Sequence, residues 1–235
     1  MSRNRRMVAG ANAHSFMQRL TFISLLLLFS VQLSAADDAR LDHAMATRWK
    51  EESNQDGLLI YSRTRAGSAL KEFKTVGVID ATSTVVFAVL NDVEAYPSFM
   101  PYTSECNVLM RTGDCTIAYQ RLELPLVSDR DYTLRSEHFK TTGPNGPIYR
   151  IQWEPANNLG PSEKPGVERV KICEGGWLIE PDGAGATRAT YSIYTDSGGA
   201  IPAVIANTGS RMAIRKMFAA VRKAAHEPKY AASKS

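Results

Sequence analysis

Cysteine is scarce in this chain of 235 residues, which excludes a fold held together by a framework of disulfides. The three cysteines, Cys106, Cys115 and Cys173, are odd in number, so at least one thiol stays free. Cys106 and Cys115 flank a predicted tight turn. A two-residue hairpin there would place Met110 opposite Cys115 and Tyr119 opposite Cys106, which separates the two thiols too far for a disulfide. We therefore expect three free thiols and a fold that depends on its hydrophobic core.

The motifs of common enzyme classes are also missing. The sequence has no Gly-x-Ser-x-Gly nucleophile turn and no phosphate-binding loop. Beyond the first 36 residues, histidine occurs only at His43, His138 and His226, without the spacing of a metal site or a cysteine close by. We expect no catalytic residue, no metal and no cofactor.

Long apolar runs are absent apart from residues 20–33, where 14 residues carry no charge. A helix that spans a bilayer takes roughly 20 apolar residues. The run follows a basic stretch that lacks acidic residues, and it precedes small residues at Ser34 and Ala36. These three parts in this order are typical of a secretory signal. We predict a signal peptide at residues 1–36 and a mature protein that is exported to the periplasm or secreted; a membrane anchor at residues 20–33 is the alternative.

Neither sign of charge dominates the predicted mature chain. Residues 1–36 hold four of the 28 basic residues and none of the 24 acidic ones, so the remainder is close to neutral. Because nucleic-acid binding needs clustered Lys and Arg, we expect no nucleic-acid partner. Translation that starts at Met17 instead of Met1 would leave the signal intact, and both starts stay open.

The hydrophobic pattern beyond residue 36 indicates one α+β domain. We predict a helical segment at residues 37–55, one domain at residues 56–226 and a disordered tail at residues 227–235. Helices are expected at residues 41–53, 84–91 (capped by Ser83) and 202–225, and strands at residues 57–63, 73–79, 107–110, 115–124, 132–139, 148–153, 167–173, 177–180 and 188–195.

The last predicted helix carries an apolar stripe with spacings of three, four and seven residues. The stripe either packs into the core or forms the roof of a cavity, and composition leaves both open. Its members are Ile201, Val204, Ile205, Thr208, Met212, Met217, Phe218 and Val221.

Two motifs resemble those of a known family. Residues 128–132, Ser-Asp-Arg-Asp-Tyr, resemble the Ser-x-Arg-Asp-aromatic strand of StAR-related lipid-transfer (START) domains. Residues 198–207 resemble the Gly-Gly-x-Ile-Pro-x-x-apolar-x-Asn segment that begins the C-terminal helix of that family. The resemblance covers roughly residues 56–225 and is closest to the phosphatidylcholine-transfer branch.

The resemblance implies a helix-grip fold, in which a curved antiparallel β-sheet wraps around a long C-terminal helix and encloses an apolar cavity. It implies a non-enzymatic carrier of one hydrophobic small molecule or lipid, gated by that helix and adjoining loops, with transient membrane contact and as a monomer. Residues 197–199 are then a hinge or an ordinary turn. The residues expected to contact the ligand are Phe99, Met100, Tyr119, Arg121, Arg130, Tyr132, Trp153, Tyr194, Ile205 and Met212.

Two departures from the family bear on the ligand. Members that bind phosphatidylcholine place an Arg and an Asp where this chain has Pro97 and Pro101. A second Arg usually follows the Arg of the Arg-Asp pair by six residues; here Ser136 is at that position and Arg135 is one residue earlier, on the other side of a regular strand. Both departures imply a ligand less polar than phosphatidylcholine, such as a sterol-like, isoprenoid or fatty acyl molecule.

Two other functions stay open. The same superfamily contains polyketide aromatases and cyclases, and an enzyme of that type would need an ionisable residue inside the cavity, with Arg121, Glu123 and Arg130 as candidates. A lipid-sensing module that docks on a cell-envelope partner would instead expose an apolar patch.

Overall fold

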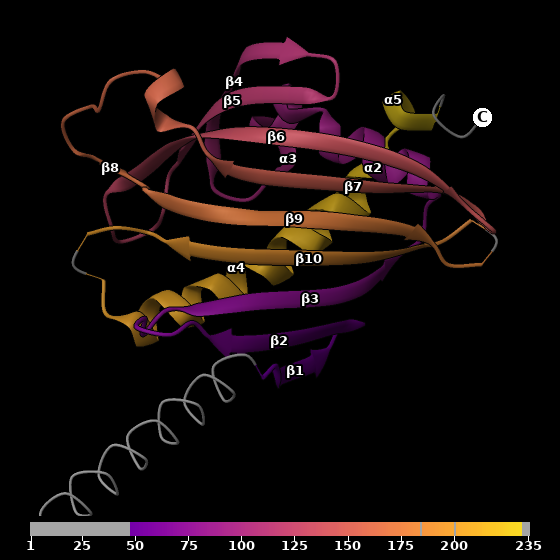
Figure 1. The fold of residues 1–235 in the computed structure, drawn as a ribbon, viewed down its shortest axis with the longest axis horizontal. Coiled ribbons are helices and arrows are strands. Elements are labelled where there is room, and N and C mark those ends of the chain that lie inside the picture. The colour runs from indigo at the N-terminus through magenta and orange to yellow at the C-terminus, as the bar shows by residue number, and fades with distance from the viewer. Residues whose placement is uncertain (1–47, 184, 200, 232–235) are drawn as a thin grey trace, which may run out of the picture. The chain divides into compact units, whose positions relative to one another are not determined.

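The structure is a computed structural model that describes residues 48–183, 185–199 and 201–231 (Figure 1). The predicted signal peptide and the first part of the predicted N-terminal helix lie outside these residues. A single sheet has the strand order β1-β2-β3-β10-β9-β7-β6-β5-β4, and the short strand β8 runs parallel to β6. The strands are β1 (Lys50–Gln55), β2 (Leu58–Thr64), β3 (Lys71–Ile79), β4 (Thr103–Thr112), β5 (Cys115–Leu122), β6 (Asp129–Gly143), β7 (Gly146–Pro155), β8 (Val167–Arg169), β9 (Ile172–Pro181) and β10 (Thr187–Asp196).

The long helix α4 (Ala203–Ala224) crosses one face of the sheet, and Figure 1 shows it running diagonally behind β10, β9 and β7. We call this the inner face. The other helices are α2 (Ser83–Asn91), α3 (Tyr96–Phe99) and α5 (Pro228–Ala231), with single 3₁₀ turns η1 (Val93–Ala95) and η2 (Asn157–Leu159). No helix among the described residues is both long and apolar enough to cross a membrane.

The register of the strands determines which side chains face α4. Trp177 lies 5.2 Å from Phe218 of α4, ring centre to ring centre, so it points to the inner face. It pairs with Ile151 of β7 and with Tyr191 of β10, and residues paired across neighbouring strands point to the same side. Successive residues alternate between the faces, so the rest of the inner face follows from these pairs.

A glycine in β3 allows α4 to approach the sheet. A Cβ added at Gly77 would lie 2.5 Å from Leu58 Cδ2 and 3.0 Å from Phe218 Cε1, both closer than ordinary van der Waals contact. Phe218 and Val221 are fully buried there, and they join one core cluster with residues of α2 and of the central strands. The C-terminal half of α4 is therefore part of the core.

The N-terminal half of α4 differs from this arrangement. Val204, Ile205 and Met212 are 78%, 62% and 53% exposed, although they belong to the predicted apolar stripe. The polar side of the helix instead faces the protein: Asn207 Oδ1 accepts a hydrogen bond from the backbone N–H of Lys71 (3.0 Å). The predicted apolar stripe therefore packs into the core only in the C-terminal half of α4, because polar contacts determine how the N-terminal half is oriented.

The remainder of the predicted N-terminal helix is a strand. Residues 50–55 form β1, which pairs with β2 through a two-residue turn at Asp56 and Gly57. Both turn residues have positive φ, 56° and 68°. Asp-Gly is the preferred sequence of such hairpin turns, and the helical spacing of the preceding apolar residues obscured it.

Several predicted boundaries also need correction. Thr82 rather than Ser83 caps α2, because its hydroxyl accepts a hydrogen bond from the N–H of Val85. The predicted strand at residues 167–173 is divided between β8 and β9. The predicted disordered tail contains α5, where the buried Tyr230 donates a hydrogen bond to Asp92 (2.9 Å).

The register that we predicted for the hairpin with Cys106 and Cys115 was also wrong. Thr112, not Met110, faces Cys115, and a bulge beyond it brings Cys106 opposite Gln120. All three thiols are free, as expected. Cys115 is only half-buried, whereas Cys106 and Cys173 are buried.

Candidate ligand-binding site

Aromatic side chains from three strands gather on the inner face. Tyr132 of β6, Trp153 of β7 and Tyr191 of β10 pack against the core cluster. The rings of Trp153 and Tyr191 are 5.9 Å apart between centres. The hydroxyl of Tyr132 donates a hydrogen bond to Gln120 Oε1 (3.0 Å), so the polar end of this side chain is satisfied within the sheet. We call Tyr132, Trp153 and Tyr191 the aromatic floor.

The aromatic floor is enclosed and yet accessible. Burial raises the pKa of Tyr132 well above its ordinary value, and it raises the pKa of Tyr191 in the same way. Each residue of the floor nevertheless keeps part of its surface accessible. The three side chains are therefore partly buried, and they are candidates for contact with a ligand on the inner face.

Apolar side chains from the helices pack against the same core cluster. Phe99 and Met100, at the end of α3, pack against the core and keep part of their surface accessible, and Met217 of α4 does the same. Glycine at position 175 leaves room for the floor, since a Cβ there would lie 2.5 Å from Trp153 Cζ2. Of the predicted ligand contacts, the structure thus brings together Phe99, Met100, Tyr132 and Trp153.

The expected loss of a cavity arginine is visible in the register. Ser136 pairs with Trp153 and so faces inward. Arg135 faces the opposite side, where it is half exposed and forms an ion pair with Glu137 (2.8 Å). The pairing of β5 with β6 runs through this stretch without a bulge, so the one-residue shift does reverse the side on which the arginine lies.

Arg130 is an inward-facing charge at the beginning of β6. Tyr132 is two positions further along the strand on the same face, and only 4% of the surface of Arg130 is exposed. Its Nε donates a hydrogen bond to the carbonyl of Ser197 (3.3 Å), and its Nη1 donates to the carbonyl of Ser128. The guanidinium thereby joins the β5–β6 loop to the connection between β10 and α4.

Three predicted ligand contacts lie on the outer face, away from α4. Tyr119 pairs with Thr133, next to the inward-facing pair of Gln120 and Tyr132, and donates a hydrogen bond to Asp131 (3.2 Å). Arg121 binds Asp129 on the same side (3.0 Å). Tyr119 and Arg121 therefore do not lie on the face with the aromatic floor; the side on which each residue points depends on the register, which the sequence does not show.

Tyr194 is the third residue on the outer face. It pairs with Glu174, and Arg65 lies over its ring at 3.9 Å from the centre. Sequence reasoning chose Tyr194 and missed Tyr191, three residues earlier and on the opposite side of β10. The signal that distinguishes them is the pairing of Tyr191 with Trp177, which requires the strand register.

Asp131 has a structural role. Its carboxylate accepts hydrogen bonds from Arg169 Nε (2.6 Å) and Nη2 (3.1 Å), and both side chains are buried. Arg169 also donates to the carbonyl of Pro161 (3.0 Å), which fixes the loop between β7 and β8 over the sheet. Burial and the neighbouring Asp131 raise the pKa of Tyr119 to about 12.

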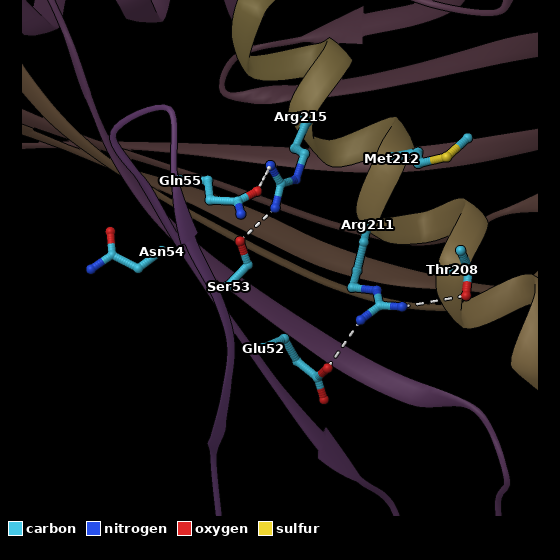
Figure 2. Close-up of a pocket in the computed structure, with 8 residues that line it drawn as sticks. All are labelled: Glu52, Ser53, Asn54, Gln55, Thr208, Arg211, Met212 and Arg215. Carbon is cyan, nitrogen blue, oxygen red and sulfur yellow. Dashed lines mark hydrogen bonds and ion pairs between the residues drawn. The ribbon is translucent and has the colours of Figure 1, made fainter.

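The predicted contacts on α4, Ile205 and Met212, point outward from the helix and not toward the aromatic floor. An open groove of about 360 Å³ does lie between this part of α4 and β1, but its lining is mostly polar (Figure 2). In it Arg211 pairs with Glu52 (3.1 Å) and Arg215 donates to Gln55 (3.0 Å). Figure 2 shows Met212 directed away from these groups. These contacts hold α4 to the hairpin of β1 and β2 at the edge of the sheet, and the polar lining of the groove does not suit an apolar ligand.

Within the described ranges, no group of three or more His, Cys, Asp or Glu side chains is placed to hold a metal ion.

Comparison with known families matches residues 79–222, more than half of the chain, to the family described as polyketide cyclase / dehydrase and lipid transport. The chain belongs to this family. A Pseudomonas aeruginosa member described as uncharacterised is 30% identical over 178 residues, which are 75% of this chain and 86% of the relative. The phosphatidylcholine transfer protein of mouse is 25% identical over 165 residues, 69% of this chain and 77% of the mouse protein.

Solved structures of family members show the same helix-grip fold. The STAR-related lipid transfer protein of Xanthomonas axonopodis superposes with a TM-score of 0.68 at 26% identity, over 76% of this chain and 99% of that one. Human STARD10 gives a TM-score of 0.69 at 18% identity, over 82% of this chain and 79% of that one. The START resemblance that rested on two motifs is thus confirmed, and those motifs form the beginning of β6 and the connection to α4.

Proposed function

We propose that this protein carries one hydrophobic ligand between the sheet and α4, and that it moves the ligand between membranes without chemical change. The observation that carries the proposal is the aromatic floor, whose side chains are enclosed, uncharged and still partly accessible. Burial of an apolar ligand there would contribute about 25 cal/mol for each Å² removed from water. The names of the mouse and Xanthomonas relatives, both lipid transfer proteins, support the same reading.

The ligand that we propose is not phosphatidylcholine. Pro97 and Pro101 stand where relatives that bind phosphatidylcholine have charged residues, and the inward-facing Ser136 replaces an arginine. These positions offer no partner for both charges of a phosphocholine group. A sterol-like, isoprenoid or fatty acyl molecule suits them better.

The membrane contact that we propose is made by exposed apolar residues near the beginning of α4. Val204 and Ile205 are exposed on the helix, and Leu126 is fully exposed on the β5–β6 loop. Arg130 hydrogen-bonds to Ser128 at the end of that loop and to Ser197 in the connection that leads to α4, so the loop and this connection are neighbours. Because the predicted mature chain is nearly neutral, we propose that this contact is apolar rather than electrostatic. Such contact is transient, which suits a carrier that is exported and acts as a monomer.

A cyclase-type enzyme has less support. It would need an ionisable residue inside the cavity that can take up or release a proton. Of the three candidates, Arg121 lies on the outer face and Glu123 is exposed. Arg130 does face inward, but its guanidinium stays protonated and is bound to two backbone carbonyls. A lipid-sensing module on an envelope partner would use the same exposed apolar residues as the proposed membrane contact.

Native mass spectrometry of the gently purified protein tests the proposal. We expect one lipid of moderate polarity per chain, and transfer of a fluorescent analogue between vesicles. A protein that holds no lipid and takes up none would contradict the carrier function. Phosphatidylcholine as the single ligand would contradict the inference from Pro97 and Pro101 and leave the carrier function standing.

A further inference from the structure

Arg130 is a buried cation whose acceptors are both neutral. A guanidinium has five N–H donors, and those of Arg130 bind two backbone carbonyls, from Ser128 and Ser197. Only 4% of the residue is exposed. Removing an unpaired charge from water is costly, so an enclosed guanidinium without a counter-charge calls for a partner.

None of the described acids around Arg130 forms a direct ion pair with it. Its chain neighbours, Asp129 and Asp131, point to the outer face and pair with Arg121 and Arg169. Glu168 stands beside Arg130 in the register of β8 and β6. Within the described part of the chain, however, no carboxylate oxygen comes within 4.0 Å of the Arg130 nitrogens.

The connection to α4 leaves space beside this charge. Gly198 and Gly199 both have left-handed backbone angles, with φ of 67° and 69°. A Cβ added at Gly199 would lie 3.4 Å from Arg130 Nη2, and one at Gly198 would lie 2.8 Å from Glu168 Oε1. The same Cβ at Gly199 would lie 3.9 Å from Glu168 Oε2, so glycine at position 199 leaves a small space bordered by both Nη2 of Arg130 and the carboxylate of Glu168.

The position of Arg130 relative to the aromatic floor indicates how a ligand would lie. Arg130 is on the inner face at the end of the sheet where α4 begins, and Tyr132 follows it on the same face about 7 Å further along β6. An amphiphile with its tail over Tyr132 and Trp153 would place its head at the guanidinium. The planar fork of arginine suits the oxygens of a carboxylate or a phosphate.

We propose that Arg130 binds the oxyanion of the ligand's head group, so that the cargo is an acidic amphiphile, with a carboxylate or a phosphate monoester at one end. This inference rests on the proposed carrier function and adds a ligand class to it. An acidic head group without a quaternary amine also agrees with Pro97 and Pro101, because proline supplies no negative charge to bind a cationic head group.

Three probes with the same chain test the proposal on the unaltered protein: palmitate, palmityl phosphate and palmityl alcohol. Dissociation constants are measured by displacement of a fluorescent lipid, at a pH where both acids are ionised and below the concentration at which the probes form micelles. We expect one or both acids to bind about 10- to 100-fold more tightly than the alcohol, which is typical of a hydrogen bond to a buried charged group. Preference for palmitate indicates a carboxylate cargo, and preference for palmityl phosphate a phosphate cargo.

Matched substitutions assign the preference to this side chain. Arg130→Gln removes the charge and should bring all three affinities to within about threefold of each other. Arg121→Gln makes the same change on the outer face and should keep the preference. If Arg130→Gln does not fold, Arg130→Lys keeps the charge without the fork and should retain part of the preference.

The outcomes separate this inference from the carrier function. Equal binding of the acids and the alcohol by the unaltered protein would overturn the role of Arg130 and leave the carrier function intact; the guanidinium would then serve only to join the two loops. A preference that survives in Arg130→Gln would overturn it as well. Failure to bind any of the three probes, or any native lipid, would count against the carrier function itself.

Discussion

Replacement of Asp131 by Asn separates a structural role from a functional one in the Ser-Asp-Arg-Asp-Tyr segment. The Asp131 carboxylate is 1% exposed and the Arg169 side chain 7% exposed, and two hydrogen bonds of 2.6 and 3.1 Å join them. Asp131→Asn keeps the shape but leaves Arg169 buried without its counter-charge. Removal of one partner from a buried pair costs about 3–5 kcal/mol, a large share of the ~5–15 kcal/mol that stabilises a typical domain.

Urea unfolding at neutral pH, followed by tryptophan fluorescence, measures this loss. Asp129→Asn is the matched control: it lies on the same strand and face, but its pair with Arg121 is partly exposed, so we expect a loss of about 0–1 kcal/mol. The double variant Asp131→Asn with Arg169→Met should recover part of the stability, because it leaves no unpaired charge. Lipid uptake by folded Asp131→Asn should match that of the unaltered protein. An Asp131→Asn protein as stable as the Asp129→Asn control, but unable to bind lipid, would refute the structural assignment.

Three further changes test the fold and the membrane contact. Gly77→Ala places a methyl group against Phe218 and should cost about 1–3 kcal/mol in urea unfolding, whereas an unchanged midpoint would mean that α4 does not pack there. Burial lowers the pKa of His138, so the contribution of His138 to stability is present above its unfolded pKa of about 6.5 and is lost as the pH falls. His138→Phe should therefore narrow the difference in Tm between pH 7.5 and pH 5. A Tm difference equal to that of the unaltered protein would contradict this. Ile205→Ser should weaken binding to neutral vesicles about tenfold without loss of stability, and equal weakening by Met110→Ser, an exposed apolar control on β4, would argue against a specific surface.

Local signals predicted most of the elements. The alternation of apolar and polar residues placed the strands β2, β3 and β5–β10 close to their observed positions, although residues 167–173 are divided between two strands. The apolar residues at helical spacing near the C-terminus placed α4 in the same way. The first predicted helix was wrong because apolar residues at helical spacing outweighed the Asp-Gly turn at residues 56 and 57. Propensity in such a short segment is weak, and pairing with β2 overrides it.

The candidate site could be predicted only in part. Tyr132 and Trp153 were chosen as aromatic residues on predicted strands, and Phe99 and Met100 because they lie in a segment expected to gate the cavity. Tyr191, which packs on the same face, was missed. A sequence shows that neighbouring strand residues point to opposite faces, but it does not show which of the two faces is covered by a helix.

The sequence by itself determined the order of the elements, the two family motifs, the near-neutral charge of the predicted mature chain and the fact that Arg135 and Ser136 point to opposite faces of the strand. The tertiary structure decided which side chains form ion pairs with one another and which stay without one. Asp131 and Arg169 are 38 residues apart, and only the parallel pairing of β8 with β6 brings them together. The same pairing leaves Arg130 facing inward without a carboxylate within 4.0 Å among the described residues. The physical reason is that burial and ion pairing are properties of contacts between distant segments, and these contacts exist only once the strand register is set.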